Sequence, residues 1–291
     1  MMTTTSASVC LGALLVIGNA CAGVPPERLR ADDFLPDMNQ PAEPVHIIGN
    51  IYYVGTNGVS SFLITTPEGH ILLDSAFNQS VPMIRDSVAR LGFRFEDIRI
   101  LLSSHAHFDH VAGHALVQQQ TGAQIVASRK DAEVIARGGE ELWHGWQASR
   151  VDRIIADNDV VRLGDVELQA HLTPGHTEGC TTWTMETMDG GQPYRVVFVG
   201  GYSINPGVKL VGNADYPHIA ADYAQTFGVL KRLEPDVFLA QHPDIFGLEE
   251  KRSRLRAGAT PNPFIDPEGY RKAVQEGEAA YLDQLRRERG Q

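Results

Sequence analysis

The sequence lacks several features that mark common classes of protein. It has only 3 cysteines in 291 residues, and Cys10 and Cys21 lie near its start, which excludes a small domain held together by disulfides. The apolar run from Val9 to Gly18 is too short to cross a membrane as a helix. Positive charge is also scarce, with 25 Lys plus Arg against 36 Asp plus Glu and a formal net charge of -11. Nucleic acid and other polyanionic partners are therefore not expected.

The first 22 residues contain no Asp, Glu, Lys, Arg or His. Their short apolar run ends in Ala20-Cys21-Ala22, a small-x-small cleavage site, so we expect a secretory signal and a periplasmic or secreted protein. The alternative is that Cys21 carries a lipid. Cleavage after Ala22 leaves Cys180 as the one cysteine of the mature chain, so that no intrachain disulfide can form. Residues 23–44, rich in Pro and Asp, are expected to form an extended arm.

From residue 45 onward, short strand patterns are followed by helical patterns, and this order occurs twice. The first half has strands from Val45 to Asp74 and an amphipathic helix at Val81 to Leu91. The second half has strands between 160 and 199 and helices near 219–233 and 266–287. With 43% hydrophobic residues and no Ser- or Gly-rich linker, residues 45–291 are predicted to be one α/β domain of two stacked sheets with helices outside, with a monomer favoured.

The stretch from Ser103 to His110 places three histidines and one aspartate within six residues. It follows the apolar run 98–102, which is predicted to be a buried strand, and precedes a predicted helix at 111–121. The carboxyl ends of strands are where α/β sheets carry their chemistry. Imidazole and carboxylate groups suit zinc. His105 and His107 can point one way while Asp109 and His110 point another, which suggests two metal ions.

Two further histidines directly follow predicted strands. His176 lies in the turn Thr173-Pro174-Gly175-His176-Thr177, and His242 follows the apolar segment 237–240. The sequence therefore predicts His105, His107 and His176 for one zinc ion, and Asp109, His110 and His242 for the other. Three ligands each would leave positions open for water, as in catalytic zinc sites. For any one histidine the alternative is a solvated loop or a core residue. His114 is a candidate to support one of the metal ligands without binding the metal itself.

These residues resemble the metallo-β-lactamase superfamily: His-x-His-x-Asp-His at 105–110, Pro-Gly-His-Thr at 174–177 and the late His242. The resemblance runs in order from about Val45 to the C-terminus. It implies an αββα four-layer sandwich with a site for two zinc ions at one edge.

Within the superfamily, the residues resemble the third subclass of zinc β-lactamases. Many other members carry a bridging aspartate where this chain has Gly201, and the first subclass has a zinc-binding cysteine where Tyr202 stands. Members of the third subclass often have a serine at the position of Tyr202, near the substrate carboxylate, and a C-terminal disulfide, and this chain departs from both patterns.

The resemblance implies a hydrolase that opens the β-lactam ring of penicillins, cephalosporins and carbapenems, with a role in antibiotic resistance. The attacking hydroxide would be held by two zinc ions coordinated with the help of His105 and His107, and Asp109 would orient it. Tyr202, Ser203 and Asn205 are candidates for contacting the substrate, although Ser203 and Asn205 are equally typical of an ordinary turn. The alternatives are a lactonase or thioesterase of the same fold, or a non-catalytic zinc-binding protein.

The segment 138–149 contains Trp143 and Trp146 and lacks a regular period. It could overhang the metal site, or its aromatic residues could pin the loop to the body of the protein.

Overall fold

The computed structural model describes residues 36–138 and 146–290. The predicted signal at 1–22, the first part of the predicted arm and Trp143 lie outside these residues. In the described part, no helix combines the length and the apolar composition that crossing a membrane requires.

One sheet has seven strands, paired in the order of the sequence. Neighbours run antiparallel from β1 to β4 and parallel from β4 to β7, so the carboxyl ends of β4 to β7 share one edge. The strands are β1 (Val45–Ile48), β2 (Ile51–Tyr53), β3 (Phe62–Thr66), β4 (Gly69–Leu73), β5 (Ile98–Leu102), β6 (Gln124–Ser128) and β7 (Arg153–Ile155).

The second sheet has five strands in the order β12-β11-β10-β9-β8. Its pairs are antiparallel except β11 with β12, so β9, β11 and β12 end at the same side of the sheet. The strands are β8 (Val160–Leu163), β9 (Val166–Leu172), β10 (Thr181–Asp189), β11 (Gln192–Val199) and β12 (Val237–Ala240).

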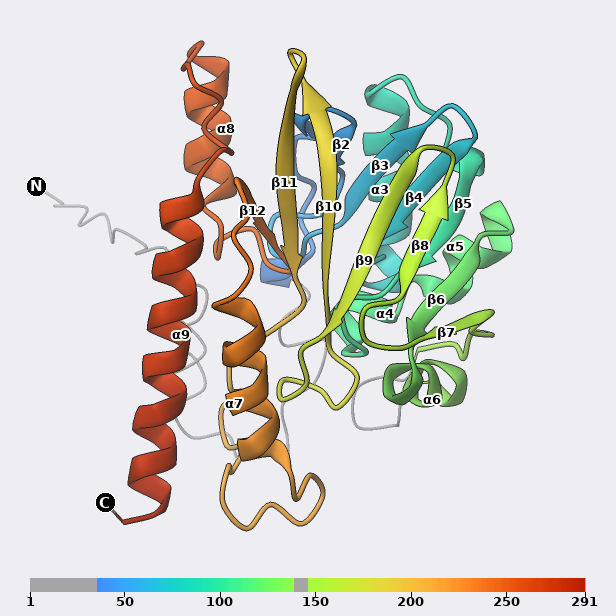
Figure 1. The fold of residues 1–291 in the computed structure, drawn as a ribbon. Helices are drawn as coiled ribbons and strands as arrows, with labels where there is room; N and C mark the ends of the chain where they lie inside the picture. Colours follow the sequence, from blue (N-terminus) through green and yellow to red (C-terminus); the bar gives the residue numbers. More distant parts are fainter. Residues whose placement is uncertain (1–35, 139–145, 291) are drawn as a thin grey trace, which may run out of the picture.

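Helices cover the outer faces of both sheets, with α7 and α9 on one flank and α3 and α5 on the other (Figure 1). The helices are α3 (Val81–Arg90), α4 (Phe108–Val111), α5 (His114–Thr121), α6 (Arg129–Arg137), α7 (Ile219–Leu230), α8 (Leu248–Arg256) and α9 (Pro267–Glu288). This arrangement confirms the predicted αββα sandwich.

The alternation of side chains along the strands explains the layers. In β4, Ile71 and Leu73 face the core shared with the second sheet, whereas Leu72 between them joins the cluster under α3 and α5. Because neighbouring residues of a strand point to opposite faces, a strand that is apolar at every position must be covered on both sides. Trp183, the third residue of β10, is fully buried in the core between the sheets.

The helix predicted at 111–121 is instead two helices, α4 and α5, separated by Ala112 and Gly113. A Cβ on Gly113 would lie 2.6 Å from the carbonyl oxygen of Ser75, so the backbone here approaches the loop after β4 too closely for a side chain. The break separates the part of the segment that carries Asp109 and His110 from the part that packs against the sheet.

Candidate metal centre

The strand ends of the two sheets bring together the residues that were singled out in the sequence. His105 and His107 lie in the loop after β5, and Asp109 and His110 lie on the short helix α4. His176 follows β9 and His242 follows β12, at the end of the second sheet where these strands terminate together. Residues from three distant parts of the sequence, 105–110, 176 and 242, therefore meet at one edge of the sandwich.

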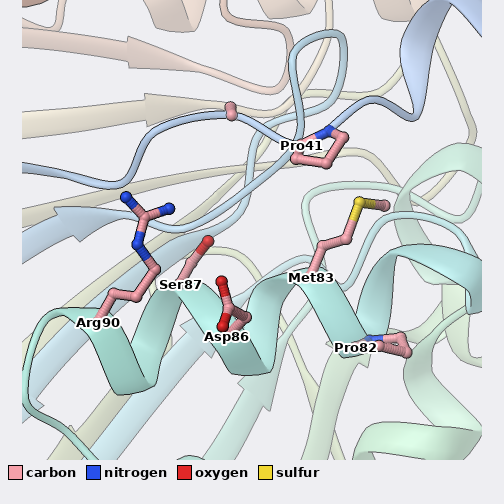
Figure 2. A pocket seen from close by; sticks show the side chains of 7 residues that line it. Pro41, Pro82, Met83, Asp86, Ser87 and Arg90 are labelled. Atoms are coloured by element: carbon pink, nitrogen blue, oxygen red, sulfur yellow. The ribbon is translucent and has the colours of Figure 1, made fainter.

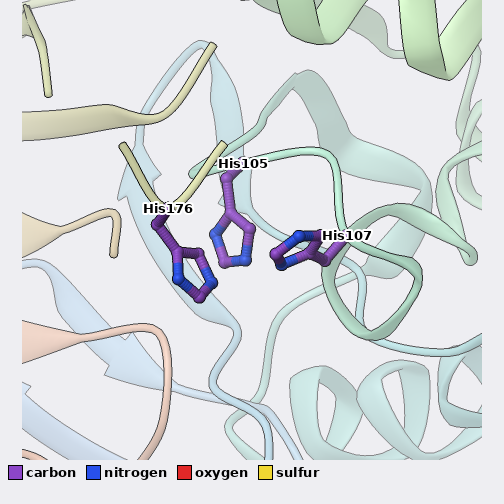
Figure 3. Close-up of side chains that lie close together, drawn as sticks. All are labelled: His105, His107 and His176. Carbon is purple, nitrogen blue, oxygen red and sulfur yellow. The ribbon is translucent and has the colours of Figure 1, made fainter. Parts of the chain in front are cut away.

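The first group consists of His105, His107 and His176. One ring nitrogen from each lies within 4.8 Å of the others. The ring centroids are 4.6 to 4.8 Å apart and the rings are nearly perpendicular, so that they surround a common point (Figure 3). His105 is fully buried, and the other two are partly open to solvent. Three imidazoles in this arrangement can supply three corners of a tetrahedron.

The second group consists of Asp109, His110 and His242, whose ligand atoms also lie within 4.8 Å of one another. The Oδ2 atom of Asp109 is 3.2 Å from Nε2 of His110 and 3.7 Å from Nε2 of His242. The rings of His105 and His110 have centroids only 4.1 Å apart, which makes the two groups neighbours. All six residues predicted as metal ligands are thus brought together, in the predicted sets of three.

Backbone carbonyl groups fix the orientation of two of the histidines. Nδ1 of His176 lies 2.7 Å from the carbonyl oxygen of Ser203, and Nδ1 of His242 lies 2.8 Å from that of Gly58. A carbonyl oxygen only accepts hydrogen bonds, so Nδ1 must carry the proton in both rings. The lone pair of each Nε2 is therefore free to bind a metal ion.

Asp74 has the corresponding role for the histidines of the first loop. Its carboxylate accepts hydrogen bonds from the Ser104 amide at 2.7 Å, from the Ser104 hydroxyl at 2.6 Å and from Nδ1 of His110 at 3.2 Å. Because the single hydroxyl proton of Ser104 goes to Asp74, its oxygen is left to accept from Nδ1 of His105, 3.1 Å away. Nε2 is again the free nitrogen in both rings.

These residues fit a metal site in three respects: an unpaired buried nitrogen, neutral histidine rings and the types of donor atom. Among the described residues, Nε2 of His105 is buried without a hydrogen-bond partner, which is costly for a polar atom unless something else is bound there. Burial also lowers the pKa of His107 to about 4 and that of His176 to about 3, so both rings are neutral at neutral pH, the form that binds metals. Imidazoles with one carboxylate form a donor set that suits zinc.

The second group, unlike the neutral histidines of the first, contains charged side chains. Burial alone would raise the pKa of the Asp109 carboxyl, but His110, His242 and His107 outweigh burial and hold that pKa below its usual range. Burial alone would lower the pKa of His110, yet Asp109 and Asp74 raise it to about 10. The second group therefore holds a charged carboxylate against a ring that gains a proton when nothing else neutralises the carboxylate.

The candidate substrate residues lie on the loop after β11. The carbonyl of Ser203 accepts hydrogen bonds from His176 and, at 2.7 Å, from the hydroxyl of Tyr223. Asn205 is exposed, and its carbonyl accepts the amide of Val208 in a turn. Tyr202 is partly buried, with its ring 6.1 Å from that of Phe227, centroid to centroid. A role in substrate binding remains a prediction for all three.

Two other candidates are also placed. His114 is fully buried between Ser75 and Ser103, whose hydroxyl oxygens lie 2.7 Å from Nδ1 and 2.9 Å from Nε2 respectively. It therefore links the loops after β4 and β5, and both ring nitrogens are engaged. Trp146 packs against the cluster that contains Ala106 and Ala132, as expected if it pins its segment to the body.

A hollow of about 250 Å³ lies elsewhere, between the N-terminal segment and α3 (Figure 2). Pro41, Met83, Asp86 and Arg90 are among its lining residues, and it contains none of the six candidate ligands. The chemistry therefore belongs to the histidine groups and not to this hollow.

Gly201 offers a test of the first group. A Cβ at this position would lie 2.8 Å from Cδ2 of His176 and 3.0 Å from its Cγ, so the ring must move. We expect Gly201→Ala to weaken zinc binding by the first group by about 10-fold, measured by competition with a chromophoric chelator. Gly228→Ala on α7 is the matched control, since the nearest atom to its Cβ is Nη1 of Arg232 at 3.7 Å. Equal affinity in the two variants would contradict the expectation.

Comparison with known proteins agrees with this geometry. The model of the metallo-beta-lactamase superfamily matches residues 54–242. Among solved structures, native FEZ-1 metallo-beta-lactamase from Legionella gormanii is 42% identical, with a TM-score of 0.84 over 87% of this chain and 98% of that chain. BJP-1, a subclass B3 metallo-beta-lactamase of Bradyrhizobium japonicum, is 38% identical, with a TM-score of 0.82 over 88% of this chain and 98% of that chain.

Curated sequences give shorter matches, and the chain spans less than half the length of the first of them. The hydroxyacylglutathione hydrolase of Maricaulis maris is 36% identical over 98 residues, which cover 34% of this chain and 31% of that protein. The two β-lactamases are thus similar to the chain over 87% and 88% of its length, and the hydroxyacylglutathione hydrolase over 34% of it.

Proposed function

Because the chain belongs to the metallo-beta-lactamase superfamily and resembles its B3 members, we propose that it is a zinc-dependent hydrolase that opens the ring of β-lactam antibiotics. The observation that carries the proposal is the pair of adjoining three-residue groups, His105 with His107 and His176, and Asp109 with His110 and His242. Each group would hold one zinc ion and leave coordination positions open.

Opening a strained cyclic amide requires a strong nucleophile and stabilisation of negative charge on the carbonyl oxygen and the departing nitrogen. Zinc, when bound, supplies Lewis acidity and lowers the pKa of water to about 7. The protein orients the reactants. The Asp109 carboxylate, held charged among histidines, can accept a hydrogen bond from the attacking water and so direct its lone pair at the substrate.

The rigidity of the ligands follows from their partners. His176 and His242 are fixed by carbonyl groups, and His105 and His110 are fixed through Ser104 and Asp74. A site whose ligands are oriented before the reaction needs little rearrangement during it, which is the basis of catalysis by preorganised charge. Ser203 and Asn205, on the loop that also fixes His176, are proposed to contact the substrate carboxylate, with Tyr202 beside them.

A second candidate function is hydrolysis of a thioester or a lactone, since a hydroxyacylglutathione hydrolase shares 36% identity over part of the chain. Against it stands Gly201, the position where the resemblance places a bridging aspartate in such enzymes. A side chain there would collide with His176, whose Cδ2 would lie 2.8 Å from the Cβ. The missing aspartate therefore argues for the β-lactam substrate.

The decisive test is hydrolysis of a chromogenic cephalosporin by the purified protein. Removal of metal with a chelator should lower the rate at least about 100-fold, and added zinc should restore it, because the proposed nucleophile is water that zinc would activate. A glutathione thioester and an acyl homoserine lactone serve as competing substrates. Faster turnover of either, or a rate that the chelator does not change, would contradict the proposal.

The proposal extends to the organisation of the chain. Residues 1–22 would direct export and be removed, residues 23–44 would form an arm, and residues 45–291 would form the metallo-hydrolase domain. The mature enzyme would then act in the periplasm or outside the cell and protect its host from β-lactams.

A further inference from the structure

Asp131 is a buried acidic residue that the proposed reaction does not use. It lies in the first turn of α6, whose N-cap residue Ser128 accepts a hydrogen bond from the Asp131 amide. Its exposed fraction is 2%. Burying a carboxyl group is costly unless hydrogen bonds compensate, so its partners should reveal why it is there.

The partners of the Asp131 carboxyl come from two loops that are distant in sequence. One is the backbone amide of Ala106, which stands between His105 and His107. Another is the hydroxyl of Thr177, 3.2 Å from Oδ1, in the residue next to His176. The third is the backbone of Gly179 in the same turn. One side chain thus joins the loop that carries two ligands of the first group to the loop that carries the third.

Gly179 shows how closely the parts fit. A Cβ there would lie 2.4 Å from both Cγ and Oδ1 of Asp131 and 2.4 Å from Oγ of Ser128, so only glycine leaves space for the carboxyl. The Ser128 hydroxyl also donates to the carbonyl of Gly179 at 2.6 Å. The first turn of α6 is therefore docked directly on the turn that carries His176.

We infer that Asp131 is a positioning residue for the first metal group. By accepting hydrogen bonds from both loops, it sets the spacing between His105 and His107 on one side and His176 on the other. This inference rests on the proposed zinc site but not on the identity of the substrate. It assigns to α6 a function in metal binding, although the helix contributes no ligand.

The main test is Asp131→Asn. Asparagine has the same shape but only one acceptor oxygen, so its NH₂ group must face a donor in one of the two loops. We expect the affinity for the first zinc ion to fall by about 10- to 100-fold, as for other residues that orient metal ligands, with a much smaller change for the second ion. Both affinities are measured by competition with a chromophoric chelator. The absorption spectrum of the cobalt-substituted protein reports the ligand geometry independently of activity.

Asp266→Asn is the matched control. Asp266 is the N-cap of α9, and its carboxylate accepts from the amide of Gly269 at 2.8 Å and pairs with Lys251 at 2.8 Å. The same substitution at the start of another helix should lower the melting temperature and leave both zinc affinities unchanged. If Asp131→Asn behaves in this way too, with a first-site affinity within about two-fold of that of the unmodified protein, Asp131 is purely structural and the inference is wrong.

A second pair of variants decides the matter if Asp131→Asn does not fold. Thr177→Ser keeps the hydroxyl that donates to Asp131, whereas Thr177→Val removes it and keeps the shape. We expect Thr177→Val to bind the first zinc several-fold more weakly than Thr177→Ser. Equal affinities would overturn the inference.

The same measurements separate this inference from the proposed function. If the unmodified protein binds no zinc, the metal centre and this inference both fail. If it binds zinc but hydrolyses no β-lactam, only the proposed function fails, and the affinity ratio between Asp131→Asn and the unmodified protein still decides the role of Asp131.

Discussion

Asp109→Ala is expected to lower kcat/KM for a chromogenic cephalosporin by about 100-fold or more and to lower the zinc content from about two ions per chain to about one. The second group would keep only His110 and His242, which are too few donors to retain zinc firmly. The same change removes the carboxylate that orients the attacking water. Mass spectrometry under native conditions gives the zinc content, and steady-state kinetics gives the rate.

The fold should survive this substitution, because the contacts of Asp109 are with histidines at the edge of the sandwich and not with the core. Asp86→Ala, an exposed aspartate on α3, is the matched control and should change neither the rate nor the zinc content. Two zinc ions in Asp109→Ala would show that Asp109 is not a ligand. If the variant retains two zinc ions but loses activity, Asp109 orients the attacking water without binding zinc.

The six metal ligands could be predicted because each lies in a short sequence pattern that is recognisable by itself. Three histidines and an aspartate within six residues, placed after an apolar strand, are visible in the sequence, and His176 and His242 share the same position relative to a strand. The structure brings the six together in the predicted sets. The groups that orient these ligands were not predicted, because the carbonyls of Gly58 and Ser203 belong to the backbone and carry no sequence signature.

Asp74 and Asp131 could have been suspected from the sequence. Asp74 ends a predicted strand, and parallel neighbours end at the same edge of a sheet. Asp131 lies in the first turn of α6, three residues after Ser128, where an acidic residue is expected simply to stabilise the helix start. Only the tertiary structure shows that these carboxyl groups contact the loops of His105 and His176 instead of solvent.

Secondary structure was missed where local patterns are weak. β7 has only three residues, two of which are exposed, and it is a strand because β6 pairs with it. α8 is mostly charged, so it lacks an apolar stripe that would reveal it. The prediction of a single helix at 111–121 was wrong because Gly113 approaches Ser75 closely, and a contact between segments that are distant in sequence leaves no local pattern.

Tyr202 shows how packing changes the meaning of a position. The sequence suggested a residue beside the substrate carboxylate, but its ring also packs against Phe227 of α7 and lies at the backbone of α9, where a Cβ on Gly277 would be 2.6 Å from two of its ring carbons. The large ring of Tyr202 therefore packs the loop after β11 against α7 and α9. A contact with substrate would be additional to this role.

Trp183→Ala is expected to lower the free energy of unfolding by about 3–5 kcal/mol, the largest stability effect that we predict. Trp183 is fully buried between the sheets, where it pairs across strands with Ala170 and Phe198. Its Nε1 donates to the carbonyl of Ser103 at 3.0 Å, so a side chain of the second sheet is bonded to the end of β5, two residues before His105.

Trp183→Phe separates the two contributions of this residue. Phenylalanine fills much of the same space but cannot donate a hydrogen bond, which leaves the buried carbonyl of Ser103 without this partner at a cost of about 1–3 kcal/mol. Urea unfolding of the metal-free protein measures both variants. A loss below about 0.5 kcal/mol in Trp183→Phe would show that the hydrogen bond adds little. A loss in the expected range, together with weaker zinc binding, would show that the core between the sheets also holds the metal loop in place.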